Sequence, residues 1–322
     1  MAINLLNIQP TKVSRDLSGY ITYIYGPGGA GKTTFGVQAP GALLLAFERG
    51  YNALPGVMAQ DITTWGQMKE VLRELKKPEV KAVFRTVIVD TVDIASVLCE
   101  KYICSQLGIE NIGDGGWGTN GWAKVKREWE QTFREITMQG YALIFISHSK
   151  DKTFKPKNAP EYNQTIPSCS NAYNEIIKNM SDIQGYIDVN GNERKLVLRS
   201  PDGSVECKCR FKHIAPVIEF SYDSLVKALN DAIDKEAAET SNKFVTNERA
   251  SVTSAPEYDY DALMEEFSAV AGDLMNKSQA KYGPMITQIV DRILGRGKRI
   301  SETTPDQAEF VYLILQEVKE LQ

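Results

Sequence analysis

Residues 26–33 read Gly-Pro-Gly-Gly-Ala-Gly-Lys-Thr, a complete phosphate-binding loop of the form G-x-x-x-x-G-K-[ST]. Glycines let the backbone bend so that its N–H groups converge on the β-phosphate of a nucleotide, and the N-terminus of the following helix adds partial positive charge. The loop therefore predicts a site for a nucleoside triphosphate, with ATP and Mg²⁺ as cofactors. The residues expected to contact the nucleotide are Gly26, Pro27, Gly28, Gly29, Ala30, Gly31, Lys32, Thr33 and Thr34.

Three side chains have the chemistry to hold the phosphates and the metal ion. Lys32 would reach the β- and γ-phosphates, and the Thr33 hydroxyl would ligate Mg²⁺. Residues 85–90 read Arg-Thr-Val-Ile-Val-Asp, a hydrophobic strand that ends in an acid. This acid, Asp90, is expected to complete the metal site. Asp93 follows one helical turn later and is interpreted as a charge at a helix N-terminus.

The loop requires a strand before it and a helix after it, and the sequence supplies both. Residues 20–25 are apolar and β-prone, and residues 32–38 are compatible with a short helix. Farther on, nearly continuous apolar runs, typical of buried parallel strands, alternate with helical patterns. This alternation indicates an open α/β sheet. The predicted strands are residues 43–47, 86–89 and 141–146, and the predicted helices are residues 64–76, 91–107 and 121–139.

The pattern changes after residue 183. Three strand-like runs, residues 183–189, 194–200 and 205–211, are separated by Asn-Gly-Asn and Pro-Asp-Gly turn signals, which predict an antiparallel extension of the sheet. A helical stretch then leads into a segment rich in Ser, Thr, Asn and Ala, which is typical of a linker. The predicted organisation is an ATPase core at residues 1–238, a linker at residues 239–257 and a small all-helical module at residues 258–322.

Bulk properties narrow the class of protein. The chain has 322 residues and a net charge of −4, so any contact with nucleic acid must come from a local basic patch. No apolar run is long enough to span a bilayer and the N-terminus lacks the features of a signal peptide, so a cytoplasmic location is expected (the host cytoplasm if the gene is carried by a phage). The five cysteines form no C-x-x-C pair and there are only two histidines, so no structural zinc site is expected.

Residues 43–48 read Leu-Leu-Leu-Ala-Phe-Glu and place Glu48 directly after the strand that follows the phosphate-loop helix. At this point the chain resembles the RecA family of ATPases, in which the corresponding glutamate activates the attacking water. The resemblance implies that Glu48 is the general base. The alternative is an ordinary surface-loop glutamate beside Arg49 and Gly50.

A second buried strand ends in Ile-Ser-His at residues 146–148. In RecA-like proteins the corresponding strand ends in a polar sensor, often glutamine, which bonds the γ-phosphate and connects to a DNA-binding loop. The resemblance gives this role to His148, with Ser147 as the second choice. The alternative is a histidine with a purely structural role.

Lys208 and Arg210 lie two apart in a strand-like segment, so both side chains would point to one face. RecA-like recombinases and DnaB-type helicases have a similar pair of cations, which reaches the nucleotide of the neighbouring subunit and stabilises charge during phosphoryl transfer. The resemblance implies a catalytic role for both residues within a homo-oligomer, either a ring or a filament. The alternative is a solvent-exposed strand face.

Residues 20–215 as a whole resemble phage-borne RecA-like ATPases, some of which act as recombinases or single-strand annealing proteins. The order of Gly26–Thr33, Glu48, Asp90, His148 and the Lys208–Arg210 pair carries the resemblance. It implies a RecA-like core with a mostly parallel sheet. Histidine in place of the glutamine at the sensor position is a departure, and it puts DNA-coupled switching of the RecA type in doubt.

Two segments are candidates for binding single-stranded DNA. Residues 113–122 are rich in glycine and contain Trp117 and Trp122, of which Trp122 is assigned to core packing. Residues 150–158 carry four lysines and one aspartate, a local net charge of +3, and are expected to form a loop that neutralises phosphates and stacks on bases. A solvated lysine loop is the alternative. The expected DNA contacts are Trp117, Lys150, Lys152, Phe154, Lys155 and Lys157.

The leading hypothesis is an ATP-dependent protein that binds single-stranded DNA in phage-type recombination or annealing. A single-strand-binding protein is a further candidate partner. One alternative is a helicase-type motor on the same core, which would unwind duplex DNA. The other is a nucleotide-dependent switch that binds a protein partner through the C-terminal helices. A small-molecule kinase is disfavoured because the chain has no arginine-rich lid.

Overall fold

The computed structural model describes residues 6, 8–114, 118, 120–155, 160–240, 244–249 and 258–322. The chain divides into two units, Met1–Ser254 and Ala255–Gln322. Trp117 and Lys157, two of the expected DNA contacts, lie outside the described residues.

The first unit is built on one large sheet with the strand order β11-β9-β8-β2-β6-β5-β3-β4. The strands from β8 through β4 run parallel, while β9, β10 and β11 add antiparallel pairs. This confirms the predicted α/β class with a mostly parallel sheet and an antiparallel extension. The strands are β2 (Thr22–Gly26), β3 (Ala42–Ala46), β4 (Ala59–Asp61), β5 (Thr86–Asp90), β6 (Ala142–Phe154), β8 (Ile183–Asn190), β9 (Glu193–Val197), β10 (Lys208–Cys209) and β11 (Val217–Glu219).

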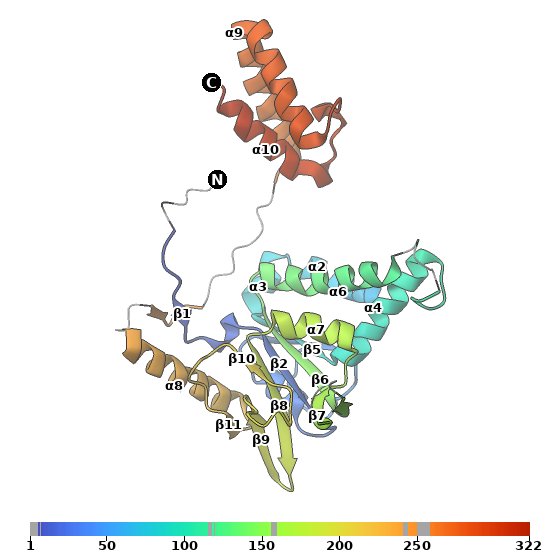
Figure 1. Ribbon diagram of the computed structural model, residues 1–322, viewed down its shortest axis with the longest axis vertical. Coiled ribbons are helices and arrows are strands. Elements are labelled where there is room, and N and C mark those ends of the chain that lie inside the picture. The colour runs from blue at the N-terminus through green and yellow to red at the C-terminus, as the bar shows by residue number, and fades with distance from the viewer. Residues whose placement is uncertain are drawn as a thin grey trace. The chain divides into compact units, whose positions relative to one another are not determined.

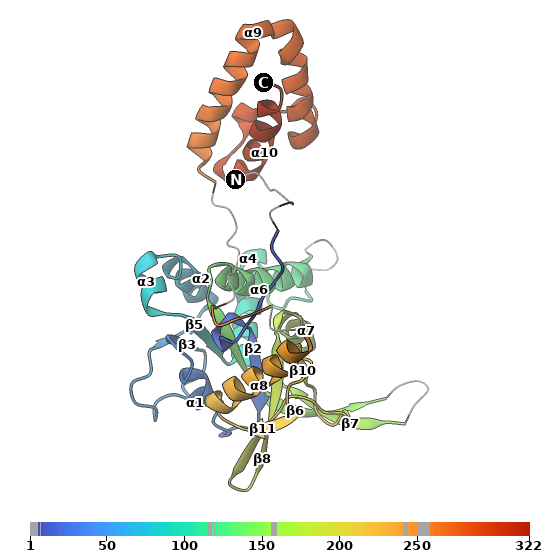
Figure 2. The same ribbon diagram turned by 90° about the vertical axis from the view of Figure 1, so that its left-hand side faces the viewer.

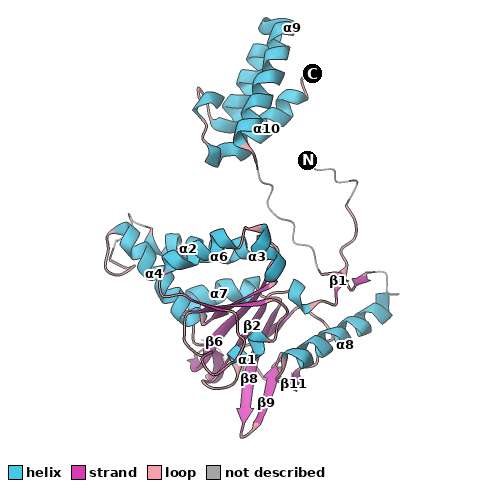
Figure 3. Cartoon of the chain, turned by 180° about the vertical axis from the view of Figure 1, so that it is seen from behind, coloured by secondary structure: helices cyan, strands magenta, loops and turns pink. Residues whose placement is uncertain are grey.

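Helices cover both faces of this sheet, with α2, α4, α6 and α7 on one side and α8 on the other (Figure 1). Figure 3 shows the same arrangement from behind, with α8 beside β11. The helices of the first unit are α1 (Lys32–Val37), α2 (Trp65–Glu74), α3 (Pro78–Val83), α4 (Val92–Leu107), α6 (Gly121–Met138), α7 (Asn171–Met180) and α8 (Tyr222–Thr240).

Each face of the sheet has its own apolar core. Along β5, Val87 and Val89 pack against the core under α2, α4, α6 and α7, whereas Ile88 packs with α1 and α8. The same alternation repeats along β3 and β6. Because successive side chains of a strand point to opposite faces, burial on both faces requires an unbroken apolar run. This is why the central strands were predictable within one or two residues.

The lysine-bearing segment that was expected to be a loop is largely a strand. β6 continues to Phe154 and pairs with the antiparallel β7 (Tyr162–Pro167). Cross-strand contacts hold the pair, including a hydrogen bond from Thr153 Oγ1 to Asn163 Oδ1 of 2.7 Å. Figure 2 shows this hairpin projecting from the sheet. We call β7 and residues 149–155 the arm.

Two other expectations need correction. Of the strand expected at residues 205–211, β10 pairs with β8 and Val205 forms one isolated bridge with Thr165 of β7. Part of the expected linker belongs to the core, because β12 (Val245–Thr246) pairs in parallel with β1 (Val13–Ser14). Arg249 Nε also donates a hydrogen bond of 3.0 Å to the carbonyl of Ser18, which lies in the short 3₁₀ helix η2 (Leu17–Gly19).

The second unit is helical. It contains α9 (Tyr260–Leu294), the 3₁₀ turns η3 (Ile300–Glu302) and η4 (Pro305–Gln307), and α10 (Ala308–Lys319). The backbone of α9 is non-helical at Ser278, so this element folds back on itself (Figure 2). Its core consists of Phe267, Leu274, Val290, Ile314, Leu315 and Val318. Among the described residues of both units, no helix is long and apolar enough to cross a membrane.

Candidate nucleotide-binding site

The phosphate-binding loop joins the end of β2 to the start of α1. Gly29 and Gly31 have positive φ angles of 72° and 91°, which side-chain-bearing residues rarely adopt. Gly26 is required for space, because a Cβ there would lie 2.9 Å from the Cβ of Ile187. The backbone of the loop therefore depends on Gly26 and Gly31, which the motif prescribes, and also on Gly29, which it does not.

Lys32 is buried at the first position of α1. Its Nζ donates hydrogen bonds to the carbonyls of Gly26, at 3.0 Å, and Pro27, at 2.8 Å. Burial lowers the pKa of Lys32, while the carboxylates of Asp90 and Glu48 oppose this shift. A cation held here is placed to meet the phosphates that the loop would bind.

Thr33 and Asp90 form a pair of oxygen ligands at the carboxyl end of the sheet. Thr33 Oγ1 donates a 2.6 Å hydrogen bond to Asp90 Oδ2, so residues far apart in sequence meet at one point. Burial raises the pKa of Asp90, and the hydrogen bond from Thr33 partly offsets this effect. A hydroxyl and a carboxylate are the hard oxygen donors that Mg²⁺ prefers, so this pair fits the predicted metal site.

Glu48 lies beside this pair and has a different partner on each carboxylate oxygen. Its Oε1 accepts a 2.7 Å hydrogen bond from Thr91 Oγ1, and its Oε2 lies 3.2 Å from His148 Nε2. The backbone N–H of Glu48 also donates to the carbonyl of Asp90, at 3.1 Å. Thr91 was missed in the sequence, where its only signal is its position directly after Asp90.

His148 reaches this site because β6 lies between β2 and β5. Asp93 holds its backbone: Asp93 Oδ2 accepts from the His148 N–H at 3.3 Å, and Asp93 Oδ1 accepts from the Ser168 hydroxyl. Asp93, an acid in the first turn of α4, therefore links the start of that helix to His148 in β6 and to Ser168, which directly follows β7. The second-choice sensor, Ser147, is buried and donates to the carbonyl of His148 at 3.0 Å.

A cavity of about 400 Å³ brings together nine of the twelve residues predicted for the nucleotide site, all except Gly26, Pro27 and Gly28. A volume of this size is within the range of small-ligand sites. The cavity is lined by Gly29, Ala30, Gly31, Lys32, Thr33, Thr34, Glu48, Gly50, Ala53, Leu54, Asp90, Thr91 and His148.

Arg194 and Phe220 approach the loop from the antiparallel extension and were not identified from the sequence. Arg194 Nη1 lies 3.2 Å from the position of a Cβ at Gly31, and Phe220 stacks on Phe35 of α1 with ring centroids 5.1 Å apart. Arg194 and Phe220 lie near the phosphate loop because β9 and β11 fold back toward α1. No local sequence pattern predicts this position.

Lys208 and Arg210 are at the other end of the sheet. β10 pairs with Ile183 and Gln184, which in turn pair with the first residues of β2, whereas the phosphate loop follows the last residue of β2. Both cations meet the C-terminus of α7, with Lys208 partly buried and Arg210 exposed. Lys208 Nζ donates to the carbonyl of Lys178 at 2.5 Å, and Arg210 Nη2 donates to that of Asn179 at 3.2 Å. Within one chain they do not join the nucleotide site.

The arm carries most of the described DNA-contact candidates. Phe154 and Tyr162 stack across the hairpin with centroids 5.2 Å apart, and Lys152 Nζ lies 4.8 Å from the Phe154 ring. Lys150 Nζ donates to the carbonyl of Ser168 at 3.0 Å, and Lys155 pairs with Glu161 at 2.9 Å. Trp122 is 48% exposed, which corrects its assignment to the core.

Comparison with known proteins finds one family and several similar proteins. The AAA_24 family, described as an AAA domain, matches residues 18–211. The SPbeta prophage-derived uncharacterized protein YorG of Bacillus subtilis (strain 168) is 30% identical over 332 aligned residues, which cover 100% of this chain and 99% of that protein. Among solved structures, the KaiC-like protein PH0186 of Pyrococcus horikoshii OT3 aligns with 14% identity and a TM-score of 0.38, covering 66% of this chain and 95% of that one.

Proposed function

The chain belongs to the AAA_24 family of P-loop NTPases, and on this premise we propose that it binds and hydrolyses ATP while its arm binds single-stranded DNA. The process that fits this activity is phage-type recombination or annealing, and the full-length similarity to a prophage protein supports a phage setting. One observation carries the DNA part of the proposal. β6 is a single strand that passes from His148 in the cavity to Lys152 and Phe154 in the arm.

The proposed hydrolysis uses the groups that line the cavity. Lys32 and the loop N–H groups hold the phosphates, and Thr33 and Asp90 supply the ligands for Mg²⁺, which when bound neutralises phosphate charge. Glu48 accepts a proton from the attacking water, with Thr91 orienting its carboxylate. His148 lies beside Glu48, so a change at the γ-phosphate would reach the start of the arm through this residue.

Hydrolysis is tested with Glu48→Gln, which keeps the shape of the side chain and removes its basicity. We expect phosphate release to fall by at least about a hundredfold. Binding of a fluorescent ATP analogue should change little, because Glu48 is assigned to water and not to phosphate. Glu70→Gln on the exposed surface of α2 is the matched control. Unchanged turnover in Glu48→Gln would remove Glu48 from the role of general base.

DNA binding is tested by filter binding of a labelled oligonucleotide across a salt series, with and without a non-hydrolysable ATP analogue. Alanine at Lys152, Lys155 and Lys157 should weaken binding and reduce the salt slope by up to about 2, since each phosphate contact to a single strand contributes about 0.7. Alanine at three exposed lysines elsewhere, Lys81, Lys227 and Lys281, gives the same change in net charge. Equal, weak binding by both triple variants and the wild type would eliminate the DNA proposal.

The same variants separate the alternative functions. ATP-driven unwinding of a duplex would indicate a helicase-type motor. A lysine-arm variant that keeps full biological function would favour a nucleotide switch with a protein partner. One observation favours that alternative: Phe310 and Leu313 on α10 and Met285 on α9 are exposed on the second unit.

A further inference from the structure

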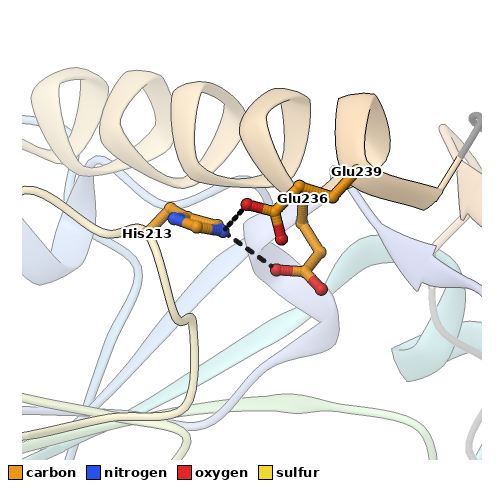
Figure 4. A group of neighbouring side chains, drawn as sticks. All are labelled: His213, Glu236 and Glu239. Atoms are coloured by element: carbon orange, nitrogen blue, oxygen red, sulfur yellow. Dashed lines mark ion pairs between the residues drawn. The ribbon is translucent and has the colours of Figure 1, made fainter.

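A second group of chemically active side chains lies outside the nucleotide cavity. His213, in the loop between β10 and β11, faces Glu236 and Glu239 on the last turns of α8 (Figure 4). His213 Nε2 is 3.2 Å from Glu236 Oε2 and 3.3 Å from Glu239 Oε1. One ligand atom of each residue lies within 4.8 Å of the others. We call these three residues the His213 cluster.

His213 Nε2 lies at ion-pair distance from both carboxylates, but its hydrogen-bonding capacity is not met. Within the described part of the chain, neither His213 Nε2 nor Glu236 Oε2 makes a hydrogen bond, although both atoms are buried from solvent. Buried polar atoms nearly always have a partner, and an orphaned one requires an explanation. Here an imidazole nitrogen and two carboxylate oxygens converge on one point, an arrangement that a shared cation would satisfy.

The spacing fits a transition-metal ion. Nitrogen and oxygen ligands lie about 2.0–2.2 Å from Zn²⁺, so two ligands of one tetrahedral ion are about 3.3 Å apart. The observed separations of 3.2 and 3.3 Å match this value. One imidazole with two carboxylates suits Zn²⁺ and similar borderline ions, whereas Mg²⁺ and Ca²⁺ prefer oxygen ligands alone.

The surroundings orient the ligands. The second oxygen of Glu239 accepts a 2.9 Å hydrogen bond from Lys212 Nζ, which fixes the orientation of the carboxylate. Arg199 Nη2 donates to the carbonyls of Phe211, at 2.6 Å, and Lys212, at 3.3 Å, and so braces the loop that carries His213. Partners of this kind hold ligands in position at metal sites.

We propose that the His213 cluster binds one divalent transition-metal ion of the zinc type, with His213, Glu236 and Glu239 as its ligands. A cavity of about 300 Å³ borders His213, so a water molecule has room to complete the coordination. The ion joins the β10–β11 loop to the end of α8. The proposal departs from the expectation, drawn from the cysteine spacing and the two histidines, that the chain has no structural zinc site. The site is independent of the proposed ATPase.

The test is calorimetric titration of the chelator-treated full-length protein with ZnCl₂, in the absence of nucleotide and Mg²⁺. We expect one equivalent to bind with micromolar or tighter affinity and to raise the unfolding midpoint. His213→Ala and Glu236→Gln should each weaken binding at least about tenfold, since even partners of metal ligands contribute that much. Asp231→Asn, also on α8, and His148→Ala, the other histidine, should retain the site.

Titration with Co²⁺ identifies the ligands independently. The visible bands of a four-coordinate nitrogen and oxygen site should appear without thiolate charge-transfer absorption, and Glu236→Gln should abolish them. This variant is nearly isosteric, so it serves if His213→Ala does not fold. Absence of saturable Zn²⁺ binding, wild-type affinity in both ligand variants, or thiolate absorption from the five free cysteines would each overturn the proposal.

Discussion

The carboxylate of Glu48 is held on both of its oxygens, and the hydroxyl of Thr91 holds one of them. Thr91 is buried and Glu48 is partly exposed, so the hydrogen bond of 2.7 Å between them is made at the edge of the cavity. A general base must be in hydrogen-bond reach of the proton that it accepts. Thr91 therefore acts on water only through Glu48, as a positioning residue.

Thr91→Val removes this hydrogen bond with little change in volume. We expect kcat to fall about tenfold, in line with roughly 1–1.5 kcal/mol for one hydrogen bond, and nucleotide affinity to stay nearly constant. Phosphate release and equilibrium nucleotide binding measure the two effects. Thr132→Val, which removes another buried hydroxyl bonded to a glutamate, Glu128, is the control. A parallel loss of affinity would place Thr91 in nucleotide binding instead.

The raised pKa of Asp90 predicts how the free energy of unfolding changes with pH. Burial is the chief reason that its pKa in the folded state is raised above the ordinary value of 3.8. Between these two pKa values the native state binds more protons than the unfolded state, so stability falls as pH rises through this window. Above the window the full penalty remains. Asp90→Asn should therefore stabilise the nucleotide-free protein at pH 7 by about 1 kcal/mol.

Urea unfolding at several pH values measures this effect. The advantage of Asp90→Asn should shrink as pH falls through the folded-state pKa toward 3.8, because the wild-type carboxyl becomes neutral there. The variant should also lose the Mg²⁺-dependent part of its stabilisation by ATP. If Asp90→Asn is less stable than the wild type at neutral pH, the hydrogen bond from Thr33 outweighs the burial penalty.

At the scale of elements, the apolar runs predicted the central sheet because β2, β3, β5 and the first half of β6 are buried on both faces. β4 reads Ala-Gln-Asp and β11 reads Val-Ile-Glu, short edge strands with little apolar signal, and neither was predicted. The far half of β6 was taken for a loop because its lysines suggested one. This half of β6 is a strand because it pairs with β7, which lies beyond the connecting residues in the chain.

The candidate site was predictable to the same extent and for the same reason. Asp90 ends β5, Glu48 lies two residues past the end of β3, and His148 lies in β6 beside the last residue of β2, so all three meet at one edge of the parallel sheet. The positions of Arg194 and of the His213 cluster depend on how the antiparallel extension of the sheet folds back toward α1 and α8. Residue spacing does not predict this path of the chain, so only the structure locates these residues.

Lys208 and Arg210 have a structural role at the C-terminus of α7. Cations near a helix C-terminus stabilise its free carbonyls by typically 0.3–1 kcal/mol. Lys208→Ala should therefore lower the free energy of unfolding by about 1 kcal/mol. Urea denaturation of the purified variant measures this loss, with Lys126→Ala on the exposed surface of α6 as the control. A variant as stable as the wild type would show that these contacts add nothing to folding.

At the scale of the whole molecule, the two ends of the sheet have different chemistry. The phosphate loop follows the last residue of β2, while Lys208 and Arg210 lie beside residues that pair with its first. If these cations contribute to hydrolysis, as the resemblance to RecA-like proteins implies, they act on a nucleotide bound by another copy of the chain. A head-to-tail interface of this kind generates a ring or a filament. This head-to-tail arrangement does not require the second unit, which has a small core of its own.

Mixing two inactive variants tests this arrangement. Lys32→Ala removes nucleotide binding in its own subunit and leaves Lys208 intact, while Lys208→Ala keeps the nucleotide site and lacks the cation for its neighbour. Each alone should be inactive. An equal, random mixture should recover about a quarter of the wild-type ATPase rate, the share of interfaces that unite both intact halves.

Lys32→Ala mixed with Glu48→Gln is the matched control. Both lesions lie in the same cavity, so no interface between these subunits unites an intact nucleotide site with an intact base, and the rate should stay at background. Turnover by Lys208→Ala alone at the wild-type rate would confine Lys208 to capping α7. Recovery in the first mixture and not in the second would assign hydrolysis to an assembly in which each nucleotide is completed by the neighbouring chain.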